Sequence, residues 1–229
     1  PSGLPPSQPQ AEMAHPERLL VAHPFNPVYL LPLVEIVPGA RTAADAPERA
    51  AAMFAAWGMY PLILRREIEA FVADRLMEAL WREALWLVKD GIATTGEIDD
   101  AIRFGCGLRW AQMGTFQVFD IAGGEQGMRH FMRQFGPCLK WPWTKLMDVP
   151  EMDEALVETI ATQVAAQAEG HDFRALERIR DDNLVGVMQA LKFNDWGAGR
   201  TLGLYEKRLF DRGAEGGERE AADFSGPVV

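Results

Sequence analysis

Apolar residues in the first third of the chain fall into three short runs, each bounded by proline or glycine, as is typical of β-strands. The runs are 18–23, 33–37 and 60–64. An alanine-rich stretch begins at Thr42, which has capping-box spacing with Asp45, and it ends before Gly58, so a helix is predicted between the second and third runs. A strand, a helix and a strand with short connections form a βαβ unit, and we therefore predict a parallel sheet.

The spacing of apolar positions becomes helical after residue 70. Residues 71–89 predict a helix of about five turns, ~28 Å long, with apolar and aromatic residues on more than one face. Thr94 and Glu97 form a capping box, which predicts a second helix over 95–104 that ends at Gly105. Further helices are predicted over 123–135, 151–168 and 173–193. No alternating pattern follows residue 70, so the fold class is predicted to be α/β followed by all-α.

The two ends of the chain depart from this pattern. Three strands are too few for a two-sided sheet with a sufficient core, so we expect the chain to begin inside a domain whose sheet continues upstream. Glycine and charge rise from Gly197 onward, and 201–229 is predicted to be a flexible tail. The expected division is therefore a sheet region over 1–69, a helical domain over 70–200 and this tail.

Composition narrows the class of protein. Of the 229 residues, 48% are hydrophobic and 24% are charged, which is ordinary for a globular protein. The net charge of −10, with no basic stripe, argues against nucleic acid as a partner. No uncharged apolar stretch is long enough for a membrane span. Cys106 and Cys138 cannot make a disulfide framework and belong to no CxxC motif, which favours a reducing cytoplasm.

One pair of residues stands out as candidate chemistry. His23 ends the first predicted strand, and Glu35 lies within the second. The carboxyl ends of adjacent parallel strands are where open α/β sheets place their ligands. A carboxylate beside an imidazole fixes its tautomer and stabilises the protonated ring, which makes a general base. The alternative is a solvated turn histidine and an edge glutamate that never meet, and spacing alone favours that alternative.

The sequence around this pair resembles a known family. The segments HPFNP at 23–27 and LVEIV at 33–37 resemble the HxFNP…LVE segment of the 3-hydroxyacyl-CoA dehydrogenase family. FVADRL at 71–76 resembles its GF(I/V)xNRL segment, and Ser2 with Gly3 resembles the end of its STSG-type motif. The resemblance covers most of 1–195. Longer segments, such as DGIATTGEIDDAIRFGCGLRWAQMGTF, look most like the branch of the family that acts on L-carnitine.

The resemblance implies a fold and a set of roles. It implies a Rossmann-like domain without its first half over 1–69, and a helical domain like that of 6-phosphogluconate dehydrogenase that forms a homodimer. It implies NAD as the cofactor. His23 matches the general base and Glu35 its orienting carboxylate. Ser2 matches the hydroxyl that bonds the substrate oxygen and contacts the cofactor, as Asn26 also would. Asp74 takes the position of a helical-domain asparagine.

The implied reaction is oxidation of the 3-hydroxyl of L-carnitine to 3-dehydrocarnitine. The first alternative is a short-chain 3-hydroxyacyl-CoA dehydrogenase, although the chain shows no lysine-rich cluster for the phosphates of CoA. The second alternative is non-enzymatic, a helical dimerisation module without an intact cofactor site. In each case the partner is a small molecule or a second copy of the chain.

The chain departs from the family pattern in two places. No GxGxxG lies between a strand and a helix: the segments at 105–107 and 197–199 follow helices and lack the third glycine. On the order of a hundred residues of the first mononucleotide-binding half are therefore expected to be missing, and the chain is expected to bind NAD poorly. Asp74 replaces an amide that can donate with a carboxylate that accepts. Its charge would offset a trimethylammonium group, or else pair with Arg75 or water.

A trimethylammonium group is usually held by aromatic faces. The aromatic candidates are Tyr29, Trp110, Phe116, Phe119, Phe131, Phe135, Trp141 and Trp143, most of which are expected in the core. Trp110 and Phe116 are preferred because they flank Gly114 in a segment that looks poor in regular structure. Arg109 or Arg103 would meet the carboxylate of carnitine, although surface solvation is the alternative for each. No metal site is expected.

Overall fold

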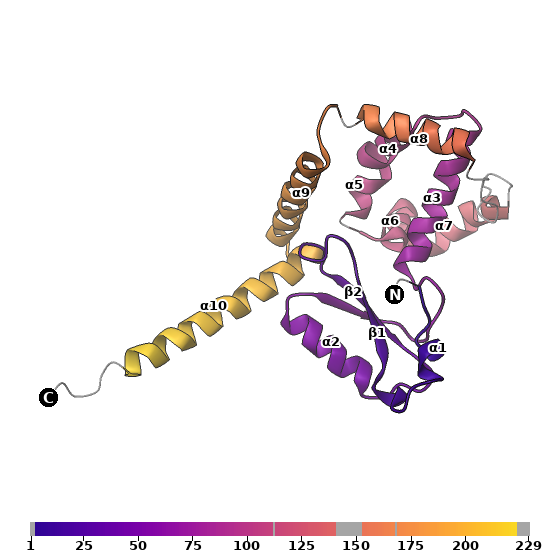
Figure 1. The fold of residues 1–229 in the computed structure, drawn as a ribbon. Helices are drawn as coiled ribbons and strands as arrows, with labels where there is room; N and C mark the ends of the chain where they lie inside the picture. The colour runs from indigo at the N-terminus through magenta and orange to yellow at the C-terminus, as the bar shows by residue number, and fades with distance from the viewer. Residues whose placement is uncertain (1–2, 112, 141–152, 168, 224–229) are drawn as a thin grey trace. The chain divides into compact units, whose positions relative to one another are not determined.

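A computed structural model describes residues 3–111, 113–140, 153–167 and 169–223. Its strands are β1 (Leu20–Pro24), β2 (Leu33–Pro38) and β3 (Tyr60–Ile63), its α-helices are α1 (Ser7–Gln10), α2 (Ala46–Ala56), α3 (Ala73–Lys89), α4 (Thr95–Ala101), α5 (Gly107–Trp110), α6 (Thr115–Ala122), α7 (Gly127–Phe135), α8 (Glu154–Gln167), α9 (Phe173–Phe193) and α10 (Gly197–Asp223), and its short turns are η1 (Pro16–Arg18), η2 (Ile102–Cys106, π-type), η3 (Gly124–Gln126) and η4 (Gly136–Lys140) (Figure 1). The chain forms two compact units, a sheet unit of Pro1–Phe71 with Asn183–Val229 and a helical unit of Val72–Asp182.

The sheet of the sheet unit is mixed rather than parallel. Its order is β1-β2-β3, with β1 antiparallel to β2 and β2 parallel to β3. The predicted βαβ unit is confirmed for β2, α2 and β3. The prediction that β1 runs parallel to them is wrong, because residues 25–32 are too few for the crossover that parallel neighbours need.

Alternation along the strands assigns the two faces of the sheet. Val34 and Ile36 are fully buried on one face, and α2 packs against β2 and β3. The other face carries Val37, which forms a core cluster with Leu64 and Phe71. Because side chains two residues apart on a strand share a face, Glu35 lies on the same face as this cluster. The cluster therefore continues into the candidate site.

The predicted start of α2 is wrong. The helix begins at Ala46, and its N-cap residue, Asp45, makes no side-chain capping bond. Thr42 instead donates its hydroxyl to the Leu19 carbonyl at 2.6 Å and accepts the Gln10 side-chain amide at 2.9 Å. Its role is therefore to close the loop before the helix. Capping-box spacing alone did not reveal this competing set of partners.

The described part of the C-terminal segment is helical. Residues 197–223 form the single helix α10 (Figure 1). Lys192 of α9 pairs with Glu206 at 2.7 Å, and the Arg208 guanidinium donates to the Ala55 carbonyl at 2.8 Å. A Cβ on Gly58, whose φ is +84°, would lie 2.7 Å from the Tyr205 ring. These interactions connect residues 205–208 to other parts of the sheet unit, and local composition does not reveal them.

The helical unit follows the sequence-based prediction more closely. α3 matches the predicted long helix, and the capping box of α4 is present, with Glu97 accepting the Thr94 N–H at 2.8 Å. The second helix does not end at Gly105. Backbone angles of −115° and −107° at that glycine make a kink within η2, after which α5 continues. The described residues of this unit contain no strand.

Candidate active site

The antiparallel pairing of β1 and β2 brings His23 and Glu35 together. They are direct partners in the register, so both side chains project from the same face of the sheet. The Nδ1 atom of His23 lies 3.0 Å from the Oε2 atom of Glu35. His23 is 7% exposed and Glu35 is fully buried. The alternative that these residues never meet is therefore wrong, although they meet across an antiparallel pair rather than at the ends of parallel strands.

This hydrogen bond selects one form of the imidazole. If Glu35 is ionised, its carboxylate can only accept, and the contact then requires the Nδ1 atom of His23 to carry the donated proton. The lone pair of the neutral ring is then on Nε2. When Nε2 takes up a proton, the buried Glu35 carboxylate stabilises the resulting positive charge. The geometry is therefore that of an oriented general base.

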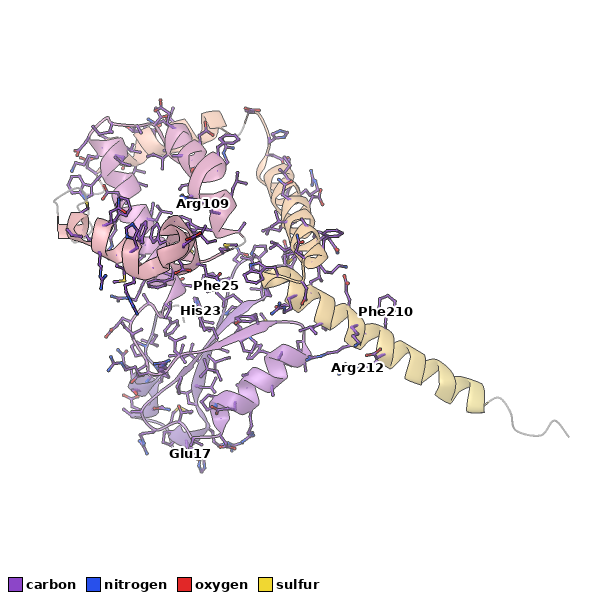
Figure 2. All side chains as sticks on the ribbon, turned by 180° about the vertical axis from the view of Figure 1, so that it is seen from behind. Glu17, His23, Phe25, Arg109, Phe210 and Arg212 are labelled. Atoms are coloured by element: carbon purple, nitrogen blue, oxygen red, sulfur yellow. The ribbon has the colours of Figure 1, made fainter. Side chains whose placement is uncertain are left out.

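Two phenylalanine rings lie against the imidazole. The centroid of Phe25 lies 5.0 Å from that of His23, and the centroid of Phe71 lies 5.4 Å away, both with edge-to-face geometry. Figure 2 labels His23 and Phe25 near the end of β1. Sequence reasoning did not assign either ring to the site. Phe25 had a signal in its position two residues after His23, whereas Phe71 is distant in sequence and was used only as part of a family motif.

The structure gives less support for the other residues predicted for the catalytic and cofactor sites. Ser2 lies outside the described residues. Asn26 is exposed in the turn that follows β1. Asp74 stands in the first turn of α3, where a carboxylate interacts favourably with the helix N-terminus whether or not it binds substrate. The roles of these three residues therefore stay predictions.

The residues predicted to bind substrate lie on helices. Trp110 ends α5 and Phe116 lies in α6, so both residues are helical, while Gly114 lies in the connection between the two helices. Trp110 is 43% exposed and Phe116 is 79% exposed, so neither is a core residue of the helical unit. Arg109 is also exposed (Figure 2). All three side chains are accessible, as binding would require.

Most of the remaining candidates either contact neighbouring side chains or lie outside the described residues. Arg103 forms an ion pair with Asp100, whose hydrogen bond and charge raise the pKa of the Arg103 guanidinium. Phe131 stacks on Phe119 at a centroid separation of 4.6 Å and meets Phe135 in a tilted arrangement at 4.8 Å. Tyr29 is exposed in the sheet unit, and Trp141 and Trp143 lie outside the described residues. These ring contacts are part of the packing of α6 on α7.

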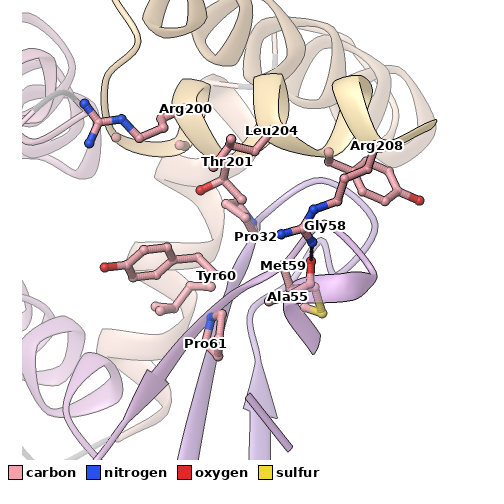
Figure 3. Close-up of a pocket in the computed structure, with 14 residues that line it drawn as sticks. Pro32, Ala55, Gly58, Met59, Tyr60, Pro61, Arg200, Thr201, Leu204 and Arg208 are labelled. Carbon is pink, nitrogen blue, oxygen red and sulfur yellow. Dashed lines mark hydrogen bonds between the residues drawn. The ribbon is translucent and has the colours of Figure 1, made fainter. Parts of the chain in front are cut away.

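An apolar groove of about 620 Å³ lies elsewhere in the sheet unit. Its lining includes Pro32, Tyr60, Leu204 and Arg208, and Figure 3 shows α10 along one side and the Arg208 hydrogen bond to the α2 carbonyl. None of the predicted site residues is among the described residues that line it. The general-base pair is therefore separate from this groove.

The glycine pairs do not form a dinucleotide-binding turn. Gly105 and Gly107 lie in η2 and α5, and Gly197 and Gly199 open α10 after another helix. A pyrophosphate site of the Rossmann type needs a glycine-rich turn between a strand and a helix. The described part of the chain contains no such turn, and it contains no cluster of three or more metal-ligating side chains. Within the same residues, no helix is both long and apolar enough to span a bilayer.

Comparisons with known proteins identify the relatives of this chain. The NAD binding domain of 3-hydroxyacyl-CoA dehydrogenase matches residues 1–68, and the C-terminal domain of the same family matches residues 71–163. The L-carnitine dehydrogenase/betainyl-CoA thioesterase of Rhizobium meliloti is 58% identical over 99% of this chain and 46% of its own length. The L-carnitine dehydrogenase of Mesorhizobium japonicum is 62% identical over 91% of this chain and 58% of its own length.

The chain therefore spans about half the length of the curated relatives it matches. One solved structure, an NAD+-dependent 5-formyl-3-hydroxy-2-methylpyridine 4-carboxylic acid 5-dehydrogenase, is similar with a TM-score of 0.64. That similarity covers 84% of this chain and 62% of the other, and its 22% identity supports the fold alone. The two family matches follow one another along the chain and together cover most of it. The chain belongs to the 3-hydroxyacyl-CoA dehydrogenase family.

Proposed function

We propose that this chain is part of an NAD-dependent dehydrogenase that oxidises the 3-hydroxyl of L-carnitine to 3-dehydrocarnitine. The observation that carries the proposal is the buried contact of 3.0 Å between His23 and Glu35. Oxidation of an alcohol needs a base that removes the hydroxyl proton, and this pair is built to do so. The identities of 58% and 62% to proteins named L-carnitine dehydrogenase support the choice of substrate.

In this proposal, His23 and Glu35 of this chain carry out the proton transfer. The Nε2 atom of His23 accepts the hydroxyl proton of the substrate, while Nδ1 keeps its hydrogen bond to Glu35. Glu35 holds the ring in place and offsets the positive charge that forms on it. In the proposed site, the Ser2 hydroxyl bonds the substrate oxygen. The nicotinamide of bound NAD would serve as the hydride acceptor.

The proposed NAD site lies mainly outside the described residues. The family match over 1–68 supports NAD, yet no described strand and helix are joined by a glycine-rich turn. Ser2 and Asn26 are the residues of this chain proposed to contact the cofactor. We expect the chain alone to bind NAD poorly, which isothermal calorimetry can measure. A micromolar dissociation constant for NAD, measured on the chain by itself, would contradict the proposal that most of the NAD site lies outside the described residues.

Recognition of carnitine is proposed for the helical unit. The exposed rings of Trp110 and Phe116 offer faces to the trimethylammonium group, which cannot donate a conventional hydrogen bond. Arg109 is proposed to meet the carboxylate of carnitine. Asp74, in the first turn of α3, is proposed to offset the positive charge of the ammonium group. These four assignments rest on the exposure or the charge of the side chains, and each can be tested by mutation.

The second candidate substrate is a short-chain 3-hydroxyacyl-CoA. The family domains that match are those of 3-hydroxyacyl-CoA dehydrogenase, which favours this alternative. Both reactions oxidise a hydroxyl on the third carbon of a carboxylic acid derivative, so the His23–Glu35 pair would serve either one. The two substrates differ in the group to be recognised, an ammonium in one case and the phosphates of CoA in the other.

We also propose that the protein forms a homodimer through the helical unit and works in the cytoplasm. Leu76, Met77 and Trp81 on α3 are exposed by between 52% and 68%, which makes α3 a candidate contact surface. The two free cysteines suit a reducing compartment. Analytical ultracentrifugation tests the dimer. A dimer with no dehydrogenase activity in any extended form of the chain would favour the non-enzymatic alternative.

A chimera separates the candidate substrates. The chain replaces the matching segment of the Mesorhizobium japonicum relative, which is 62% identical to it, and the unmodified relative is the control. NADH formation is followed with L-carnitine and with 3-hydroxybutyryl-CoA. We expect turnover of L-carnitine. Turnover of the CoA ester without turnover of L-carnitine, by a folded chimera that binds NAD, would reverse the choice of substrate.

A further inference from the structure

Two consecutive residues at the end of the first segment of the sheet unit adopt an unusual backbone conformation. Ala70 has a φ of +58° and Phe71 has a φ of +49°, although neither is glycine. The left-handed region is disfavoured for residues with a Cβ, and especially for bulky ones. Such a conformation persists only where the surrounding structure holds it. The interactions that hold this turn are therefore informative about its role.

Backbone hydrogen bonds fasten the turn on two sides. The Ala70 N–H donates to the Gly3 carbonyl, and the Phe71 N–H donates to the Ile68 carbonyl, both at 3.2 Å. Gly3 has a φ of +83°, and a Cβ added there would lie 3.1 Å from the backbone of Ala70. Only glycine combines that conformation with so close an approach. Gly3 and Ala70 thus form a joint that fixes where Phe71 enters the core.

The Phe71 side chain reaches both the core and the candidate base. It is fully buried, and it belongs to the same core cluster as Val37 and Leu64. Its ring also meets the His23 ring edge-to-face, at 5.4 Å and an interplanar angle of 60°. Core packing alone would require only an apolar side chain at this position. The ring contact adds a restraint on the imidazole.

We infer that Phe71 is a positioning residue for His23. This inference rests on the proposed function, in which His23 is the general base. Glu35 holds Nδ1 by a hydrogen bond, and the Phe71 and Phe25 rings restrict rotation of the imidazole by edge contacts. The left-handed turn places the Phe71 ring in this position. The strained turn is thus the structural means by which Phe71, the last residue of the first segment of the sheet unit, keeps the base oriented.

The orientation of His23 can be measured without turnover. The chain has four histidines, and the His23 ring signals in NMR spectra are assigned by comparison with a His23→Gln variant. In the unmodified chain we expect a slowly exchanging Nδ1–H proton and through-space contacts to the Phe71 ring. In Phe71→Leu we expect exchange of that proton to be at least about tenfold faster, because local opening becomes easier.

The matched control is Leu64→Val, which trims the same core cluster at a residue outside the two ring contacts of His23. We expect it to leave the exchange rate of the Nδ1–H proton unchanged. Phe71→Met is the second variant, because its unbranched side chain refills the core without restoring a ring edge. It should also show fast exchange, and it keeps the test decisive if Phe71→Leu fails to fold. Equal effects of Phe71→Met and Leu64→Val, or no effect of either, would overturn the inference.

Kinetics in the chimera provide a second readout. We expect Phe71→Met to lower kcat with little change in KM for L-carnitine, because the base is misplaced while binding surfaces are kept. Leu64→Val should change neither parameter. Loss through KM alone would overturn the positioning role. Fast proton exchange in Phe71→Met, in a chimera that turns over no hydroxy substrate, would support the positioning of His23 and reject the proposed function.

Discussion

The sheet unit and the helical unit present their candidate residues in opposite ways. In the sheet unit, His23 and Glu35 are buried, hydrogen-bonded to each other and set by strand register. In the helical unit, Trp110, Phe116 and Arg109 are exposed on short helices. The residues proposed for proton transfer are therefore held by contacts within the sheet unit. The residues proposed for recognition are accessible side chains of the helical unit.

Under the proposed function, this contrast assigns proton transfer to buried residues and substrate recognition to exposed ones. A buried pair with fixed geometry should influence the chemical step, because its interactions strengthen as charge develops. Exposed aromatic and charged side chains should influence binding of the substrate. Mutations in the two units should therefore divide between kcat and KM. Their effects on stability should divide as well, since core positions respond more strongly than exposed ones.

The largest expected effect is on catalysis, from Glu35→Gln. The glutamine amide keeps the shape of the side chain but can donate to Nδ1, which would leave the proton on Nε2 and remove the base. We expect kcat in the chimera to fall by about 100-fold or more, with KM little changed. Stopped-flow formation of NADH measures this. The exposed Glu17, whose Oε1 atom lies 3.3 Å from Nδ1 of His15, gives the control Glu17→Gln, and a comparable loss there would discredit the assignment.

Gly3→Ala should give the largest effect on stability. Its Cβ would press against Ala70 at 3.1 Å, and its φ of +83° disfavours any side chain, so we expect a loss of about 2–3 kcal/mol. Gly91→Ala in the helical unit is the matched control. Gly91 has a φ of +68° but open space around it, so only the conformational cost of about 1 kcal/mol applies. Urea denaturation measures both, and equal losses would mean that the joint at Gly3 is not tight.

Trp110→Ala and Phe116→Ala should sharpen the distinction between the units. Each aromatic face contributes about 0.5–2 kcal/mol to cation binding, so we expect KM for L-carnitine to rise by roughly 2- to 30-fold with kcat retained. Both side chains are exposed, so the melting temperature should change little. Phe193→Ala, at another exposed aromatic side chain, is the control. An unchanged KM in both variants would exclude these rings from the ammonium site.

The smallest expected effect comes from the capping box of α4. Thr94→Ala should reduce the free energy of unfolding by about 1 kcal/mol at neutral pH. The Thr94 backbone and side chain donate to Glu97 and lower the pKa of its carboxyl group. A carboxyl group whose pKa is lowered by folding stabilises the folded state at pH values above its unfolded-state pKa. This contribution is lost as the pH falls through the lowered, folded-state pKa. The difference between the two proteins should therefore shrink in acid.

Thr159→Ala is the control for that experiment. Thr159 lies inside α8 and bonds the Ala155 carbonyl within its own helix, so it caps no helix end. Thermal unfolding at neutral and acidic pH gives the comparison. A loss at Thr94 that stays constant with pH would show that the Glu97 carboxylate does not contribute to the cap.

Local sequence signals predicted elements well and long-range interactions poorly. The Thr94 capping box and the long helix α3 follow from neighbouring residues and are confirmed. The direction of β1 and the start of α2 depend on partners elsewhere, such as Gln10 for Thr42, and those predictions were wrong. The family resemblance pointed to His23 and Glu35, and the register explains their contact. Phe71 escaped notice because it is distant from His23 in sequence, although the two rings are in contact.

The central claim is that His23 is the general base for oxidation of L-carnitine. The most direct measurement compares NADH formation by the chimera and by its His23→Ala variant, at saturating NAD and L-carnitine. We predict turnover by the unmodified chimera and a fall of at least about 100-fold in the variant, with NAD binding retained. Turnover of L-carnitine that survives the loss of His23 would contradict the claim.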